Sequence, residues 1–423
     1  MASNRRVLIV AYHYPPEPAS GALRMAYLAK YLPRVGWDPV VLTRRLPPGM
    51  TDVATNVIRV GPAFAMQSSR APGTLDAVPN ATVEALKARA REIVFFPDRA
   101  AAWIPAAAAG GIRASRRFAF DAILSSAMPA SVHVAASIIA SATRLPWIAD
   151  YRDLWNGNPY VNEPVWRKLL LSGLERFSVG AASQLVTITQ NLADALSSFH
   201  NRPVNVIPNA YDTEEWLDVP FVAPDAFRIV HAGSLYDGQR NPEPVLAQVA
   251  ALRTSGEIAE VQLDFYGPNP GPLLELARRY GIAGIVNYHG VVARQTAMQA
   301  ERSAACLLIV QNADPRTASE YGSKIFEYQA AGPMILALGP SESVLAPYIR
   351  SNALGWFASR EDEIRSGLLQ AYQAYREQRT LRAGARDART AGSIAESFAG
   401  ILDAVTVPQV GDWARRKEPA SLR

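Results

Sequence analysis

Residues 305–338, ACLLIVQNADPRTASEYGSKIFEYQAAGPMILAL, hold two short apolar runs separated by a polar loop and a helical pattern. The runs ACLLIVQ and MILAL have the length and composition of buried strands. Between them a helix is predicted to begin near Gly322. The order strand, helix, strand predicts a parallel sheet that is covered by helices.

The charged side chains of this predicted helix are Lys324 and Glu327, three residues apart and therefore on one face. The start of a helix presents free backbone N–H groups and the positive end of the helix dipole. A cation there is unfavourable unless an anion lies nearby, so Lys324 is a candidate ligand of a diphosphate. A carboxylate accepts two hydroxyl donors, so Glu327 is a candidate ligand of a ribose. A surface salt bridge between the two is the alternative.

The same alternation of strands and helices fills most of the chain. Buried strands are predicted in the first half at 6–12, 39–43, 120–126, 146–150, 184–189 and 204–208. A second series follows at 228–233, 261–267 and 285–290. The segment DVPFVAPDAF, 218–227, has two prolines and little periodicity, which indicates a linker.

We therefore expect an α/β protein with two doubly wound, Rossmann-like domains, residues 1–217 and 228–392. Its 423 residues exceed the roughly 100–200 of one domain. Two such domains would face a central cleft, because open parallel sheets bind ligands at the carboxyl ends of their strands. An apolar helix at 393–407 is expected to return to the first domain, and residues 408–423 form a tail.

Composition excludes several classes. Apolar residues make up 49% and charged residues 19%, as in ordinary globular proteins, which argues against disorder and fibrous structure. The single cysteine, Cys306, lies in an apolar run and is expected to be a buried thiol. We find neither a signal peptide pattern nor a membrane span and expect a cytoplasmic protein.

The net charge of +5 is concentrated between residues 67 and 117, where eight basic side chains face four acidic ones. The segment ATVEALKARAREIVFF, 81–96, has the pattern of an amphipathic helix. It either docks on its own domain or makes shallow contact with an anionic membrane at the inner face of the cell membrane. We find no alternation of aromatic and basic residues of the kind that indicates nucleic-acid binding.

Five segments in order resemble glycosyltransferase family 4, more narrowly its bacterial polysaccharide-assembly members. They are YPPEPASGALRMAYLAKYLPRVGWDPVVLT, WIADYRDLW, VIPNAYD, HAGSLYDGQRNP and KIFEYQAAGPMILAL. The resemblance covers about residues 5–405 and implies the GT-B fold. It also implies retaining transfer of a sugar from a nucleotide diphosphate sugar to a glycan or polyprenyl-diphosphate-linked acceptor, in cell-surface polysaccharide or glycolipid biosynthesis. No metal and no cofactor are expected.

The resemblance assigns further residues to the donor. Arg240 follows the HAG turn and is a second candidate for the diphosphate, since its planar fork suits phosphate oxygens. A solvated loop arginine is the alternative. Gly233 and Ser234 form a tight turn where a bulky side chain would obstruct a ligand.

Two more positions are assigned to the nucleotide. Gly21 precedes a helix and would let the backbone approach the phosphate from the opposite wall, with a simple helix cap as the alternative. Gly290 and Val291 would lie near the base, although core packing explains the valine equally well.

One position departs from the family pattern of two glutamates separated by seven residues. Counting back from Glu327 reaches Ser319, and Glu320 lies one position late. We expect Glu320 to contact the donor sugar. The backbone groups of Tyr321 and Gly322 are the alternative.

The reacting centre is sought in DYRDLW, 150–155. Asp150, Arg152 and Asp153 follow a strand end, at the place where many family members carry a His-Asp pair. Arg152 stands where that histidine would be, so Asp150 or Asp153 would take the acceptor proton. Arg152 either holds one of these carboxylates or reaches an anionic acceptor. A pair that only braces the loop is the alternative.

Three histidines are further candidates for the site. His133 at the start of a helix is a candidate catalytic residue, and His13 and His231 lie near strand ends. For each of them a hydrogen-bonded structural role is the competing interpretation.

Two rival functions stay open at this point. One is a nucleotide-sugar epimerase or phosphorylase of the same architecture, which needs no second acceptor. The other is a non-catalytic, membrane-associated scaffold, against which Lys324 and Glu327 argue.

Overall fold

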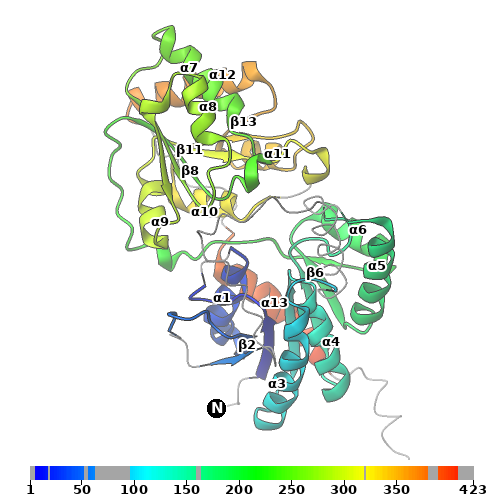
Figure 1. Ribbon diagram of the computed structural model, residues 1–423. Coiled ribbons are helices and arrows are strands. Elements are labelled where there is room, and N and C mark those ends of the chain that lie inside the picture. Colours follow the sequence, from blue (N-terminus) through cyan, green and yellow to red (C-terminus); the bar gives the residue numbers. More distant parts are fainter. Residues whose placement is uncertain are drawn as a thin grey trace, which may run out of the picture. The chain divides into compact units, whose positions relative to one another are not determined.

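The computed structural model describes residues 5–17, 20–51, 56–61, 96–158, 163–318, 321–379 and 389–407 (Figure 1). Glu320, most of the basic segment 67–117 and the tail 408–423 lie outside the described residues. The chain divides into two compact units. Unit 1 comprises residues 1–207 and 392–423, and unit 2 comprises residues 208–391.

Unit 1 is built on a seven-stranded sheet in the order β3-β2-β1-β4-β5-β6-β7, with every pair parallel. The strands are β1 Arg5–Ala11, β2 Trp37–Arg44, β3 Val57–Val60, β4 Ala122–Ala127, β5 Trp147–Tyr151, β6 Gln184–Thr187 and β7 Asn205–Val206. Ile9 of β1 is paired with Val41 on one side and Leu124 on the other. The strand order reverses at β1 and β4, as in a doubly wound sheet.

Six described helices cover this sheet. They are α1 Ser20–Tyr31, α3 Ile104–Arg117, α4 Ser131–Thr143, α5 Val165–Val179, α6 Gln190–His200 and α13 Ala391–Thr406. Local signals set their ends. The Thr189 hydroxyl accepts a hydrogen bond from the Leu192 N–H and caps α6, and Asn201 ends it in the left-handed region.

The last helix returns to unit 1, as expected. Asp403 of α13 accepts hydrogen bonds from Arg5 at the start of β1 and from Trp37 at the start of β2, at 2.5 and 2.8 Å. Phe398 of α13 lies beneath the guanidinium of Arg24 on α1, and Figure 1 draws these two helices close together. The C-terminal helix is therefore an integral layer of the first domain.

Unit 2 repeats the architecture with a six-stranded sheet in the order β10-β9-β8-β11-β12-β13, again all parallel. Its strands are β8 Phe227–Ala232, β9 Val261–Tyr266, β10 Val286–Gly290, β11 Cys306–Val310, β12 Ile335–Leu338 and β13 Gly355–Ala358. Its helices are α7 Glu243–Thr254, α8 Leu273–Arg279, α9 Arg294–Arg302, α10 Lys324–Ala331, α11 Leu345–Ser351 and α12 Glu361–Arg376. The predicted class, α/β with two Rossmann-like domains, is confirmed.

The boundary between the units differs from the expected linker at 218–227 and lies at residues 207 and 208. The reason is apolar burial. Trp216 and Val219 pack with Met298, Phe326 and other buried residues of unit 2, so the segment before β8 belongs to that unit's core. The predicted central cleft concerns the placement of the two units and stays a prediction.

Two smaller points complete the fold. The predicted helix near Gly322 begins at Lys324, two residues later. None of the helices in the described part of the chain is long and apolar enough to cross a membrane.

A buried ion pair links the first helix of unit 1 to its central strands. The Arg24 guanidinium donates through Nε and Nη2 to both oxygens of Asp150, at 3.0 and 2.9 Å. Ser126 at the end of β4 also donates to Asp150, and Arg24 donates to the Ile207 carbonyl. Removing one member leaves the other charge buried without its counter-ion.

We predict that Arg24→Met lowers the free energy of unfolding by roughly 3–5 kcal/mol, the usual loss when one partner of a buried pair is removed. The matched change Arg279→Met breaks the partly exposed pair with Glu243 and should cost less than about 1 kcal/mol. Urea denaturation of both variants measures the difference. Equal losses of unfolding free energy in the two variants would show that the buried pair stabilises the protein no more than the partly exposed one.

Candidate functional site

The loop that follows β8 in unit 2 passes unusually close to the loop that follows β9. Gly233 has φ +157° and donates its N–H to the Tyr266 carbonyl at 2.8 Å. A Cβ on Gly267 would overlap the Gly233 carbonyl oxygen, and Gly267 has φ +139°. Glycine at these two positions therefore leaves bare backbone at the carboxyl end of the sheet. Ser234 continues the turn, where its hydroxyl accepts the Tyr236 N–H.

His231 lies immediately beneath this turn and is buried. Its Nδ1 is 2.9 Å from the Leu308 carbonyl, which can only accept, so Nδ1 carries the proton. Burial, against the opposing effect of the Leu308 hydrogen bond and with the help of the nearby cations Arg240 and Lys324, lowers the pKa of His231 to about 4. The neutral ring therefore has an acceptor lone pair on Nε2, which has no hydrogen-bond partner among the described residues.

Arg240 and Lys324 both lie near His231, since the positive charge of each acts to lower the pKa of that histidine. The Arg240 guanidinium lies over the ring of Tyr236, 4.6 Å from its centroid. Its Nε is buried and has no hydrogen-bond partner in the described part of the chain. A buried N–H donor of this kind is costly unless a ligand oxygen meets it.

Lys324, the first residue of α10, is enclosed by carboxylates. Its Nζ is 2.7 Å from Glu327 Oε2 and 3.3 Å from Glu301 Oε1. Burial acts to lower the pKa of Lys324, but the charges of Glu301 and Glu327 outweigh it and the pKa is raised. The ammonium group is therefore permanently charged.

Glu327 is a buried carboxylate with two cationic neighbours. Its Oε1 is 3.7 Å from Arg294, whose guanidinium also contacts Glu215 at 2.6 Å. Burial acts to raise the pKa of Glu327, but Lys324 and Arg294 outweigh it and the pKa is lowered. The pair Lys324 and Glu327 that was weighed as a surface salt bridge thus exists, within a larger and mostly buried network.

Glu301 of α9 was missed by the reasoning from sequence. It is only 1% exposed, contacts Lys324, and has one oxygen, Oε2, without a hydrogen-bond partner among the described residues. Burial raises its pKa to about 7, Lys324 acts against this rise, and the charge of Glu327 adds to it. The available signal was its position three residues after the buried Met298, which places a carboxylate on the inner face of α9.

The remaining positions predicted for the donor are less enclosed. Gly290 has φ +68° and accepts the Gly267 N–H, and the next residue, Val291, is 65% exposed. The core-packing alternative for Val291 is therefore wrong. Tyr321 packs its ring against Phe326 and Tyr348, and Gly322 is exposed.

In unit 1 the structure corrects the role expected for Asp150. Its carboxylate is fully buried and accepts hydrogen bonds from Arg24 and Ser126. Because the carboxylate lies inside unit 1 and both of its oxygens accept hydrogen bonds from these residues, it does not reach a substrate. Asp150 is thus a structural residue, and its partner is Arg24 rather than Arg152.

Arg152 is held above the start of α1. It donates to the carbonyls of Ala127 and Met128 at 2.8 and 2.7 Å. A Cβ on Gly21, in the first turn of α1, would overlap its guanidinium. The two predicted residues therefore meet, and a larger residue at 21 would displace the Arg152 guanidinium from its present position.

Asp153 is the remaining carboxylate of the DYRDLW segment. Burial raises its pKa, and the charge of Arg152 only partly offsets this. A half-buried carboxyl group with a raised pKa is a candidate proton acceptor.

The structure also corrects His133, which is completely buried in the core of unit 1. Its Nδ1 contacts the Ser125 hydroxyl at 2.8 Å, and its ring packs against Trp147 and Tyr151. Burial lowers its pKa to about 3. A residue without surface access cannot reach a substrate. His13 contacts Glu17 at 2.9 Å, as its structural interpretation predicts.

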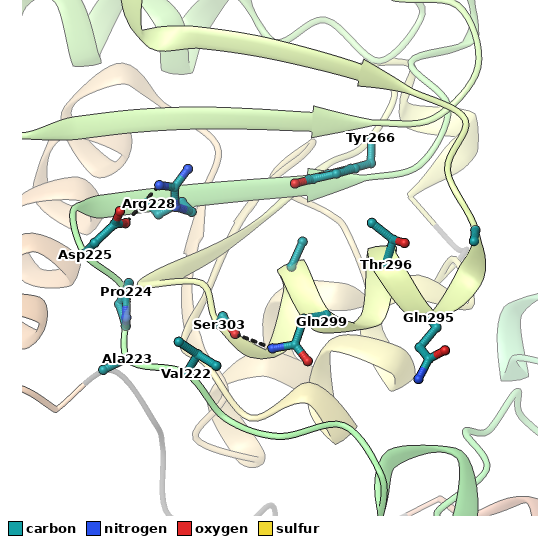
Figure 2. Close-up of a pocket in the computed structure, with 12 residues that line it drawn as sticks. Val222, Ala223, Pro224, Asp225, Arg228, Tyr266, Gln295, Thr296, Gln299 and Ser303 are labelled. Carbon is teal, nitrogen blue, oxygen red and sulfur yellow. Dashed lines mark hydrogen bonds and ion pairs between the residues drawn. The ribbon is translucent and has the colours of Figure 1, made fainter.

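Figure 2 shows a separate cavity of unit 2, about 820 Å³, between α9, the sheet and the segment before β8. It contains none of the predicted site residues. Its one cation, Arg228, is neutralised by Asp225 and Asp264. The ring of Tyr266 at its border stacks on His289, with centroids 4.3 Å apart. The described residues contain no group of three or more His, Cys, Asp or Glu that could hold a metal ion.

Comparison with known proteins matches residues 21–215 to Glycosyltransferase Family 4. None of the curated protein sequences matches the chain. Among solved structures, sucrose-phosphate synthase from Thermosynechococcus elongatus is similar with TM-score 0.58 and 15% identity, over 97% of this chain and 98% of that one.

Two further solved structures cover 94% of this chain and 99% of their own. WaaG, a glycosyltransferase involved in lipopolysaccharide biosynthesis, has TM-score 0.55 and 14% identity. The UDP-GlcNAc 2-epimerase from Methanocaldococcus jannaschii has TM-score 0.53 and 9% identity. The fold of the chain is therefore GT-B, and the resemblance to glycosyltransferase family 4 is confirmed over residues 21–215.

We predict that Glu301 makes stability fall as pH rises. Its pKa in the folded protein is about 7 against 4.5 for an ordinary glutamate, so the folded state binds the extra proton between these values. The free energy of unfolding of the wild type, minus that of Glu301→Gln, should thus decrease from pH 5 to pH 8, by up to roughly 3 kcal/mol.

Urea denaturation at several pH values measures this difference. Glu257→Gln is the control, because hydrogen bonds from Ser255 and Arg365 lower the pKa of Glu257 and keep it ionised throughout this range. Its difference from wild type should stay constant. A constant or rising difference for Glu301→Gln would contradict the predicted burial of a protonated carboxyl group.

Proposed function

We propose that this chain, whose residues 21–215 match glycosyltransferase family 4, is a retaining glycosyltransferase that uses a nucleotide diphosphate sugar. The observation that carries the proposal is the cluster of Arg240, Lys324 and bare Gly233 backbone at the carboxyl end of β8. Two cations beside a glycine turn suit a diphosphate, because the backbone admits its oxygens at close range.

The donor would be held from both of its ends. Arg240 Nε and the Lys324 ammonium bind the diphosphate, and Glu327 accepts the two ribose hydroxyls. Val291, which is exposed, offers an apolar contact to the base beside the Gly290 backbone. His231 Nε2 would accept a hydrogen bond from a hydroxyl group of the nucleotide sugar near the turn. Glu320 contacts the transferred sugar.

The chemical step breaks the bond between the anomeric carbon and the leaving phosphate oxygen. The acceptor oxygen forms its bond on the same face, and the acceptor proton passes to the leaving phosphate. Negative charge grows on that phosphate as the bond breaks, so the fixed charges of Arg240 and Lys324 stabilise the transition state. Two such cations supply the charge that a metal would otherwise supply. Asp153, with its raised pKa, is the alternative proton acceptor.

The acceptor is a glycan or a polyprenyl-diphosphate-linked sugar in cell-surface polysaccharide or glycolipid biosynthesis, at the cytoplasmic side of the membrane. WaaG, with which the chain shares its fold, acts in lipopolysaccharide biosynthesis, and this supports the proposal. Arg152, close to Gly21, is the cation of unit 1 that would meet an anionic acceptor.

An epimerase is the second candidate, since the UDP-GlcNAc 2-epimerase shares the fold. It would convert a nucleotide sugar without any acceptor. The match to glycosyltransferase family 4 favours transfer.

The function is tested by incubating the protein with radiolabelled nucleotide sugars, with and without lipid-linked acceptors. We expect acceptor-dependent incorporation of label and retained anomeric configuration by NMR. Conversion of the nucleotide sugar without acceptor would instead assign the epimerase reaction.

We predict that Glu327 is needed for nucleotide binding and Arg240 for the rate of transfer. Thermal shifts with UDP, GDP, dTDP and ADP should identify one stabilising nucleotide for the wild type. Glu327→Ala should abolish this stabilisation, because the ribose loses its acceptor. Arg240→Ala should lower kcat by roughly 10² to 10³, the usual effect of removing one group that stabilises developing charge.

The control is Arg253→Ala, which removes an exposed arginine from the end of α7. It should leave both the thermal shift and kcat unchanged. Undiminished stabilisation of Glu327→Ala by the nucleotide would refute the ribose role.

A further inference from the structure

Helix α5 of unit 1 turns a row of large apolar side chains toward solvent. Their exposed fractions run from 46% for Trp166 to 85% for Phe177. At 3.6 residues per turn they fall within an arc of about 140°. Gly173 lies on the same arc and has open space beside it. This outer face of α5 consists of Val165, Trp166, Leu169, Leu170, Gly173 and Phe177.

The opposite side fixes the rotation of the helix. Leu171 and Val179 are buried in the core of unit 1. Arg167 pairs with Glu163 at 2.7 Å and donates to the Pro97 carbonyl. Glu175 is buried and accepts the Tyr151 hydroxyl at 3.0 Å. The apolar residues therefore point outward because the inward positions are occupied by specific contacts.

The charges of α5 are divided in the same way. Its one acid, Glu175, is turned inward, whereas Lys168 and Arg176 are exposed. The Arg176 guanidinium lies over the ring of Phe199, 4.7 Å from the centroid, at the edge of the outer face. An apolar face with cationic borders and no exposed acid of its own complements a surface that is both apolar and anionic.

We propose that the outer face of α5 docks onto an anionic lipid bilayer. The helix would lie in the plane of the interface, with Leu169, Leu170 and Phe177 among the acyl chains and Trp166 at headgroup level. Lys168 and Arg176 would contact lipid phosphates. Contiguous exposed apolar surface of this kind is rare on monomeric soluble proteins without a binding role. This surface shares no residue with the 81–96 segment or with the proposed nucleotide site.

Flotation with vesicles of phosphatidylcholine and phosphatidylglycerol tests the proposal on the full chain. We expect the wild type to bind these vesicles and to bind pure phosphatidylcholine vesicles more weakly. Leu169→Gln with Phe177→Gln should reduce binding at least ~10-fold, because the inserted apolar surface is lost. Lys168→Glu with Arg176→Glu should reduce binding mainly at low salt.

The matched control is Leu217→Gln with Phe221→Gln, which replaces the same two residue types, 79% and 40% exposed, in unit 2. This variant should bind like the wild type. All of these side chains are exposed, and unchanged thermal unfolding verifies that the variants fold.

Three results would overturn the proposal. The first is a wild type that binds neither kind of vesicle. The second is equal loss of binding in the α5 variant and its control. The third is a wild-type dimer in solution that Leu169→Gln with Phe177→Gln converts to a monomer, since this would assign the face to a second copy of the chain.

Discussion

A half-buried ammonium group is stabilised by negative charge around it, and in unit 2 this requirement connects a network of charged side chains. Lys324 begins α10, Glu327 follows one turn later, and Glu301 reaches the same Nζ from α9. Arg294 then balances Glu327 and is itself balanced by Glu215, from the segment of unit 2 that precedes β8. These ion pairs connect α9, α10 and the segment before β8.

In unit 1 the charges of a buried ion pair balance each other in the same way. Arg24 and Asp150 neutralise each other below the surface, and Ser126 and the Ile207 carbonyl complete their hydrogen bonds. Because Asp150 is held by this pair, the proposed proton acceptor of the segment is Asp153. The two carboxylates are neighbours in sequence but differ in environment, since Asp150 is fully buried and Asp153 is half-buried.

Periodicity predicted the fold well because parallel strands buried on both faces are continuous apolar runs, and these are visible in the chain. The helix with Lys324 and Glu327 was found for the same reason. The surroundings of a side chain in the folded protein, in contrast, cannot be predicted from the neighbouring residues in the sequence. The sequence around His133 does not show that its ring lies in the core, and the sequence around Asp150 does not show its partner Arg24, 126 positions away. Glu301 was missed because only the tertiary structure brings α9 against Lys324.

The return of α13 to unit 1 has a consequence for how the chain is made. Arg5, Trp37 and Arg24 all contact a helix that begins at Ala391, so the first domain is finished only by residues that are synthesised after unit 2. Unit 2 is continuous in sequence and is complete before them. During synthesis unit 1 therefore cannot complete its fold until α13 has been made, whereas unit 2 can fold as soon as its own residues are available.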